Sequence, residues 1–87
     1  MNREQIDQFV TESGFESVAI FENPGYYRAF IGVTIDGAAV YSMEKMIGCL
    51  TGEMTREEAI EFIEYNTVRS LGYVDNPPVI IHEIEEA

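Results

Sequence analysis

The sequence predicts a single α+β domain over residues 1–87, with elements in the order α-β-β-β-α-α-β. Three observations predict it. Apolar residues recur at helical spacing in three segments, β-branched residues concentrate in short runs bounded by turn residues, and 87 residues with 46% hydrophobic content suffice for one core. Since three predicted strands follow one another directly, we expect a small antiparallel sheet with the helices packed on one face.

The first helix is expected to begin after Asn2, which forms a capping-box pattern with Gln5, and to end at residues 13–14, a Ser-Gly pair. The mixture of β-branched and aromatic residues in 15–21 predicts a strand. The Asn-Pro-Gly sequence at 23–25 predicts a turn after it.

The strongest hairpin signal is Asp36 followed by Gly37. Residues 29–35, which are rich in β-branched side chains, are predicted to form the strand before this turn. Residues 38–41 are predicted to form the returning strand.

Two further helices are expected after the hairpin. Ser42 can cap a helix of about two turns, which the Thr-Gly pair at 51–52 ends. The longest periodic segment starts at Thr55 with a second capping-box pattern and continues to Leu71. Gly72 stands where a left-handed helix cap is favoured.

The last strand is predicted over residues 79–84, because the Pro-Pro pair at 77–78 cannot continue a helix. A half-buried, hydrogen-bonded imidazole is the default expectation for His82 within this strand. Glu85 and Glu86 are interpreted as an acidic, solvated tail. A weak divalent cation held by Glu83 and Glu85 is the less favoured alternative, so no metal site is predicted.

Charge is the most unusual global property, because sixteen acidic residues face five basic ones and give a formal net charge of −11. This balance excludes a protein that binds nucleic acid by neutralising phosphates, and it disfavours anionic membranes. A basic protein partner is favoured instead. Nine acids and two bases lie in residues 50–87, and seven acids and three bases lie in residues 1–49. The net charge is therefore −7 in residues 50–87, which contain the longest predicted helix, and −4 in residues 1–49.

No catalytic site and no cofactor are predicted. The only cysteine, Cys49, has no nucleophile signature around it and is interpreted as a small buried hydrophobic residue. The first residues lack the apolar run of a secretory signal, so we expect a cytoplasmic location.

The longest helix is predicted to have an acidic outer side with two exposed apolar groups among the carboxylates. A solvated acidic stripe is the simplest interpretation of this pattern. The functional alternative is a contact surface for a basic protein, because like-charged neighbours such as Glu57 and Glu61 repel each other. The candidate partner-binding residues are Glu53, Glu57, Glu58, Glu61, Glu64, Tyr65 and Val68.

Polar residues also fall on the predicted inner side of this helix. Asn66 and Ser70 are one turn apart and could simply satisfy nearby backbone groups. Alternatively, Asn66, Thr67 and Arg69 line a polar pocket for a nucleotide signal or another small ligand, as in a binding protein that acts as a sponge. A third hypothesis is a structural dimerisation module joined through Tyr65 and Val68.

Two stretches carry a resemblance to a known group of proteins. They are Phe-Ile-Gly-Val-Thr at 30–34 with the hairpin after it, and the helical run at 58–71, which contains Glu-Tyr-Asn-Thr-Val-Arg. Together they resemble small proteins of phages and prophages of Gram-positive and gut bacteria, over about two-thirds of the chain. The sequence at 70–73, Ser-Leu-Gly-Tyr, departs from the Ala-Leu-Pro-Tyr of that group.

The resemblance implies a setting, the cytoplasm of a host bacterium, and no particular activity. Small acidic phage proteins often occupy the basic groove of a host defence nuclease, with carboxylates in place of DNA phosphates. In this setting the acidity of the chain favours the hypothesis of a non-enzymatic inhibitor of a nucleic-acid-handling defence system, such as an anti-CRISPR protein. Its leading contacts would be Glu53, Glu57, Glu58, Glu61 and Glu64.

Overall fold

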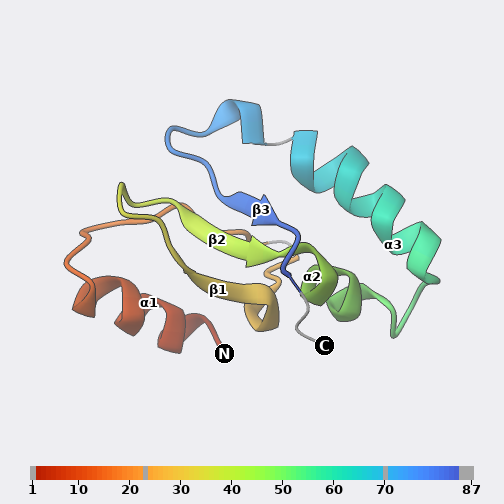
Figure 1. The fold of residues 1–87 in the computed structure, drawn as a ribbon, viewed down its shortest axis with the longest axis horizontal. Coiled ribbons are helices and arrows are strands. Elements are labelled where there is room, and N and C mark those ends of the chain that lie inside the picture. Colours follow the sequence, from red (N-terminus) through yellow and green to blue (C-terminus); the bar gives the residue numbers. More distant parts are fainter. Residues whose placement is uncertain (1, 23, 70, 85–87) are drawn as a thin grey trace.

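The computed structural model describes residues 2–22, 24–69 and 71–84. It is an α+β fold, as the sequence predicts (Figure 1). In chain order the elements are α1 (Arg3–Glu12), the 3-10 turn η1 (Tyr27–Ala29), β1 (Phe30–Val33), β2 (Ala39–Ser42), α2 (Met43–Leu50), α3 (Arg56–Phe62), the π-helical segment η2 (Ile63–Val68), the 3-10 turn η3 (Leu71–Tyr73) and β3 (Val79–Ile81).

All three α-helices begin at the predicted caps. The side chains of Asn2, Ser42 and Thr55 each accept a hydrogen bond from the backbone N–H three residues later, and Asn2 and Thr55 form complete capping boxes. These bonds satisfy backbone donors that have no partner inside the helix. Local sequence thus determines where each helix starts.

The sheet is mixed, and the prediction of a wholly antiparallel sheet is wrong for one of its two strand pairs. The strand order is β1-β2-β3, with β1 and β2 antiparallel and β2 and β3 parallel. The predicted turn joins β1 to β2, and Gly37 adopts a φ of 92° there. A parallel neighbour needs a crossover connection, which α2 and α3 supply between β2 and β3.

The strand predicted over residues 15–21 does not form. This segment runs as irregular backbone across the sheet, and its apolar side chains, among them Val18, Ile20 and Phe21, pack on the core. The N–H of Phe21 donates to the Tyr41 hydroxyl at 3.2 Å. This backbone group is therefore bonded to a side chain and does not pair with a neighbouring strand. The β-branched residues cover the sheet without joining it.

The core lies on one face of the sheet. Phe30 and Tyr41 are register partners, and Tyr41 pairs with Ile80 on the other side, so these three side chains share that face. They pack with buried residues of all three α-helices, including Ile6, Met46 and Ala59. The α-helices therefore all pack toward the same face of the sheet, as expected (Figure 1).

The longest helix is less regular than its periodicity predicts. The α-helix α3 ends at Phe62, and η2 continues it with π-helical hydrogen bonding. We call α3 and η2 together the main helix. Gly72 does not adopt the predicted left-handed conformation, because it lies inside the 3-10 turn η3.

Strand β3 is half the predicted length. It ends at Ile81, so His82 lies beyond the strand and is exposed, contrary to the expectation of a half-buried imidazole. The predictions for Asn23 in the turn, for Ser70, and for Glu85 and Glu86 in the tail lie outside the described residues. None of the described helices has the length and apolar character needed to cross a membrane.

Candidate functional site

The cap at the start of the main helix fixes the charge state of Glu58. The backbone N–H of Thr55 donates to Glu58 at 2.9 Å, while the N–H of Glu58 donates to the Thr55 hydroxyl at 3.2 Å. The bond from the Thr55 backbone lowers the pKa of Glu58 below its ordinary value. Glu58 is therefore held as a carboxylate by its role in the cap.

The other acidic residues of the outer side are exposed and unneutralised. Among the described residues the ion pairs join Arg3 to Asp7 and Glu22, Lys45 to Glu83, and Arg56 to Glu44. None of these pairs uses the exposed carboxylates of Glu57, Glu61 and Glu64 on the main helix, or that of Glu53 in the turn before it. Arg3, Lys45 and Arg56 are thus paired elsewhere, and none of them neutralises the acidic stripe of the main helix.

Two apolar side chains stand among these carboxylates, as the sequence predicts. Tyr65 is 65% exposed and Val68 is 43% exposed. The guanidinium of Arg69 lies 5.7 Å from the centre of the Tyr65 ring, a cation-π distance. Arg69 thus belongs with Tyr65 on the outer side and does not contribute to the pocket expected on the inner side.

An open hollow of about 350 Å³ lies on the outer side. Its walls combine two carboxylates, those of Glu58 and Glu61, with the aromatic rings of Phe62 and Tyr65. Met54 and Asn66 complete it. A cationic side chain with an apolar stem matches this lining, because carboxylates attract its head while aromatic faces cover its stem.

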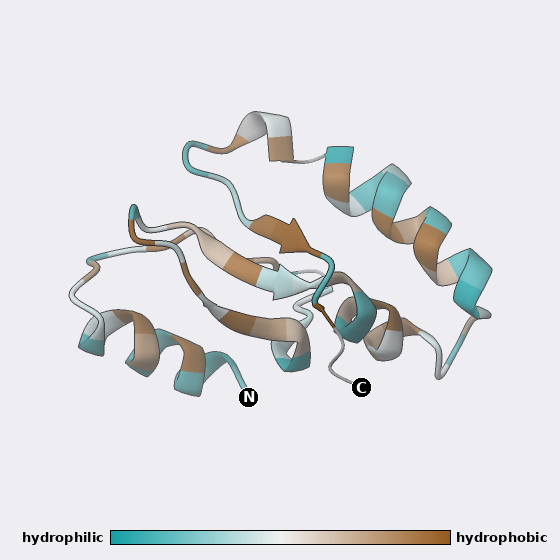
Figure 2. Ribbon diagram, viewed as in Figure 1, coloured by the Kyte–Doolittle hydropathy of each residue, from teal (hydrophilic) through white to brown (hydrophobic). Residues whose placement is uncertain are grey.

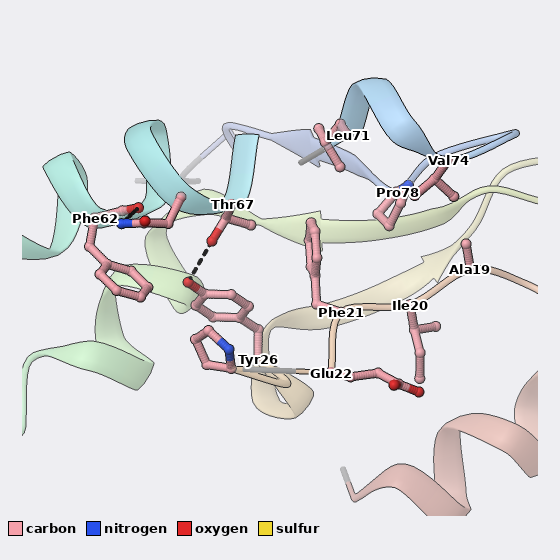
Figure 3. A pocket seen from close by; sticks show the side chains of 12 residues that line it. Ala19, Ile20, Phe21, Glu22, Tyr26, Phe62, Thr67, Leu71, Val74 and Pro78 are labelled. Atoms are coloured by element: carbon pink, nitrogen blue, oxygen red, sulfur yellow. Dashed lines mark hydrogen bonds between the residues drawn. The ribbon is translucent and has the colours of Figure 1, made fainter. Parts of the chain in front are cut away.

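The inner side of the main helix is buried. Ala59 and Ile63 are fully buried, and Thr67 is 6% exposed. The Thr67 hydroxyl and the Tyr26 hydroxyl lie 2.9 Å apart in a buried hydrogen bond that joins positions 41 residues apart (Figure 3). This bond connects the helix to the loop before η1.

Tyr26 is held tightly at this junction. It is 3% exposed, its φ is 49° in the left-handed region, and its ring packs edge-on against Phe21 at 5.7 Å. Burial raises the pKa of the Tyr26 hydroxyl, an effect that its bond to Thr67 partly offsets. Tyr26 therefore stays a neutral hydrogen-bonding group at physiological pH.

A cavity of about 370 Å³ opens beside this bond, between the main helix and residues 19–26. Figure 3 shows its largely apolar wall. Apart from the Tyr26, Asn66 and Thr67 polar groups, it is lined by Ala19, Ile20, Phe21, Glu22, Pro24, Phe62, Leu71, Val74 and Pro78. Among the described residues that line it, none is basic and only Glu22 is charged; the Glu22 carboxylate binds Arg3 at 2.6 Å.

The structure therefore separates residues that the sequence analysis grouped together. Asn66 and Thr67 line the cavity, Arg69 does not, and the Asn66 amide donates to the Phe62 carbonyl at 3.3 Å. Tyr26 is the main residue that sequence reasoning missed. Its partner lies far away in the chain, so no local pattern indicates it.

Two further predictions concern Cys49 and metal binding. Cys49 is half-buried and packs on the core. Within the described ranges, no three His, Cys, Asp or Glu side chains gather closely enough to hold a metal ion.

Comparisons with known proteins place the chain in no family: no family model, no curated protein and no solved structure matches it.

Proposed function

We propose that this protein acts by binding, without catalysis, and that the outer side of the main helix contacts a basic protein surface. The observation that carries the proposal is the row of exposed carboxylates of Glu53, Glu57, Glu61 and Glu64, none of which has an ion-pair partner among the described residues. Exposed Tyr65 and Val68 supply the apolar centre that a protein contact needs.

The open hollow supports the same proposal. A Lys or Arg of the partner would place its stem between Phe62 and Tyr65 and its charge near Glu58 and Glu61. Arg69 beside Tyr65 would help to orient the partner, since it repels the charged head of that base and so directs it toward Glu58 and Glu61. Such a contact forms quickly and weakens with salt.

A nucleic-acid-binding groove is the basic surface that fits best, because its lysines and arginines are arranged to meet a row of negative charges. The protein would then displace nucleic acid from a host nuclease, as an anti-CRISPR or related anti-defence inhibitor does, in the bacterial cytoplasm. The negative charge concentrated on residues 50–87 and the resemblance to phage proteins both support this setting.

Affinity capture from a bacterial lysate that contains defence nucleases tests this function, followed by binding measurements on the captured partner. The variant E57Q/E61Q/E64Q should lose roughly tenfold or more in affinity. The control E4Q/E12Q/E16Q removes three exposed carboxylates from another region and gives the same net charge of −8. Equal affinity of the two variants would contradict a specific role for the helix.

The cavity favours a second candidate function, binding of a small ligand. Its volume of about 370 Å³ lies within the range of small-molecule sites, and its walls are apolar with hydroxyl and amide groups at one end. Because no basic side chain lines it, a neutral ligand fits better than the nucleotide signal considered from the sequence.

Native mass spectrometry of the purified protein distinguishes the two candidates. A retained neutral compound, lost in the variant Phe21→Trp that fills the cavity, would support the ligand function. A protein that carries no small molecule and binds a basic partner with unchanged affinity in Phe21→Trp would exclude the cavity from the function.

A further inference from the structure

The cavity of about 370 Å³ has two ends of different chemistry. One end holds the aromatic rings of Tyr26 and Phe62 and the hydrogen bond between Tyr26 and Thr67 (Figure 3). The other end is aliphatic, with Leu71 in η3 and Val74 just after it. Figure 2 shows hydrophobic segments, coloured brown, at η3 and in the coil that follows, between hydrophilic segments of the chain. A ligand that matches this lining has two unlike parts.

Contacts within the core fix the aromatic end in advance. Phe21, which also lines the cavity, packs edge-on against Tyr26 with 5.7 Å between the ring centres. Its ring is also tilted against Tyr41 at 4.7 Å, and Tyr41 contacts Phe30 edge-on at 5.8 Å. Such ring contacts are favourable beyond the area that they bury. A ligand ring at this end would extend an ordered row of rings, so little side-chain ordering opposes its binding.

Hydrogen-bonding groups lie beside these rings. The Tyr26 hydroxyl lies 2.9 Å from the Thr67 hydroxyl. A phenol oxygen can donate and accept at the same time, so the Tyr26 hydroxyl can bond a ligand group in addition to Thr67. Asn66 precedes Thr67 and also lines the cavity; its amide nitrogen donates to the Phe62 carbonyl, and its amide oxygen is an acceptor. A single hydroxyl on a ligand ring matches these groups.

The charge of the lining favours a neutral ligand. Glu22 is the one charged side chain among the described lining residues, and Arg3 holds its carboxylate at 2.6 Å. A buried anion would find no base in this lining, and a cation would compete with Arg3 for Glu22. Burying an unpaired charge is costly. Neither charged form of a ligand therefore fits as well as a neutral one.

From these features together we infer that the cavity binds a neutral aromatic molecule that carries a hydroxyl on its ring and a short alkyl chain. The ring lies at the aromatic end, and its hydroxyl bonds Tyr26 or Asn66. The chain extends toward Leu71 and Val74. This inference rests on the second candidate function, binding of a small ligand, and gives that ligand a chemical class. It does not depend on a basic protein partner.

Nuclear magnetic resonance titration of the isotope-labelled full chain with matched neutral probes tests this class. The probe para-propylphenol has the aromatic ring, the hydroxyl and the chain. Phenol lacks the chain, propylbenzene lacks the hydroxyl, and para-propylcyclohexanol lacks the aromatic ring. The backbone amide signals of the residues that line the cavity should shift when para-propylphenol is added.

The dissociation constants of the probes should rank in a defined order. That of para-propylphenol should be roughly tenfold or more below that of phenol, because the chain buries apolar surface. It should be about two- to tenfold below that of propylbenzene, which forms no hydrogen bond. A similar factor, about two- to tenfold, should separate it from para-propylcyclohexanol, which offers no aromatic ring.

A charge placed at the aliphatic end locates the alkyl chain. Val74 is 42% exposed, and Val74→Asp should weaken para-propylphenol binding about fivefold or more while leaving that of phenol nearly unchanged. Ile35→Asp adds the same charge at a fully exposed position that does not line the cavity, so it should change neither affinity. Circular dichroism checks that both variants are folded. Equal weakening in the two variants would contradict this placement of the chain.

The probes also separate this inference from the function on which it rests. If any of the three comparison probes bound the cavity as tightly as para-propylphenol, the proposed class would be wrong, although the cavity would still hold a small ligand. If no probe bound up to about millimolar concentration, or if the signals shifted only outside the cavity, both the inference and the second candidate function would fail. Capture of a basic partner is scored separately with the glutamate variants.

Discussion

The two sides of the main helix differ in almost every physical property. On the inner side Ala59, Ile63 and Thr67 are buried and join the helix to the core and to Tyr26. On the outer side Glu57, Glu61, Glu64 and Tyr65 are exposed, and we expect them to contribute little to the fold. The contrast teaches that stability and binding reside in different residues of one element, so substitutions can separate them.

The largest expected effect is on the inner side. Ile63→Ala removes a fully buried side chain from the core and should lower the free energy of unfolding by about 3 kcal/mol. Val68→Ala, on the outer side, should change it by less than about 0.5 kcal/mol. Urea unfolding of both variants checks this, and similar losses would mean that both sides support the fold.

The buried hydroxyl pair should have a smaller effect. Tyr26→Phe or Thr67→Val alone removes the 2.9 Å bond between the two buried hydroxyls and should cost about 1 kcal/mol. The double variant should cost less than the sum of the two. A thermodynamic double-mutant cycle from urea unfolding measures this coupling, and strictly additive losses would argue against the bond.

Alkaline pH should act through the buried tyrosines. Burial raises the pKa of both Tyr26 and Tyr41, so the folded state releases these protons at higher pH than the unfolded chain does. Their contribution to stability is therefore complete below about pH 10, the ordinary tyrosine pKa, and is lost as pH rises above it.

The free energy of unfolding, measured at several pH values, should show this loss above about pH 10. The Tyr41→Phe variant should lose less stability over the same range, because it lacks one of the two buried hydroxyls. Tyr65→Phe removes an exposed hydroxyl from the outer side and should keep the wild-type profile. If Tyr65→Phe flattened the profile and Tyr41→Phe did not, the assignment to buried groups would be wrong.

The smallest effect concerns the acidic stripe itself. E57Q/E61Q/E64Q relieves repulsion between like charges one turn apart, so it should leave stability unchanged or raise it by a few tenths of a kcal/mol. Thermal unfolding at low salt measures this. A clear loss of stability would show that these carboxylates support the fold, which would weaken the separation of the two sides.

Much of the fold follows from local sequence. The caps at Asn2, Ser42 and Thr55 and the turn at Asp36 and Gly37 each satisfy backbone groups within a few residues, and all four form as predicted. Such features depend on nearby atoms only. They can therefore be identified without knowledge of the tertiary structure.

The errors concern contacts between distant residues. Residues 15–21 have the composition of a strand, but the Tyr41 hydroxyl takes the backbone bond of Phe21. The parallel pairing of β2 and β3 depends on the crossover through α2 and α3. A local sequence pattern shows neither the bond between Phe21 and Tyr41 nor the parallel pairing of the two strands.

The candidate site divides in the same way. The exposed acidic stripe, with Tyr65 and Val68, follows from helical periodicity and is confirmed as a surface. Its role in binding stays a prediction. The inner placement of Thr67 follows from the same periodicity, but the cavity also depends on Tyr26, whose bond to Thr67 joins distant parts of the chain.

The dependence of partner affinity on salt tests the central claim most directly. Affinity of the wild-type protein for its captured partner should fall steeply between about 0.05 M and about 0.5 M salt. The slope should be much shallower for E57Q/E61Q/E64Q and unchanged for E4Q/E12Q/E16Q. Equal slopes for all three proteins would contradict the claim that the outer side of the main helix makes the contact.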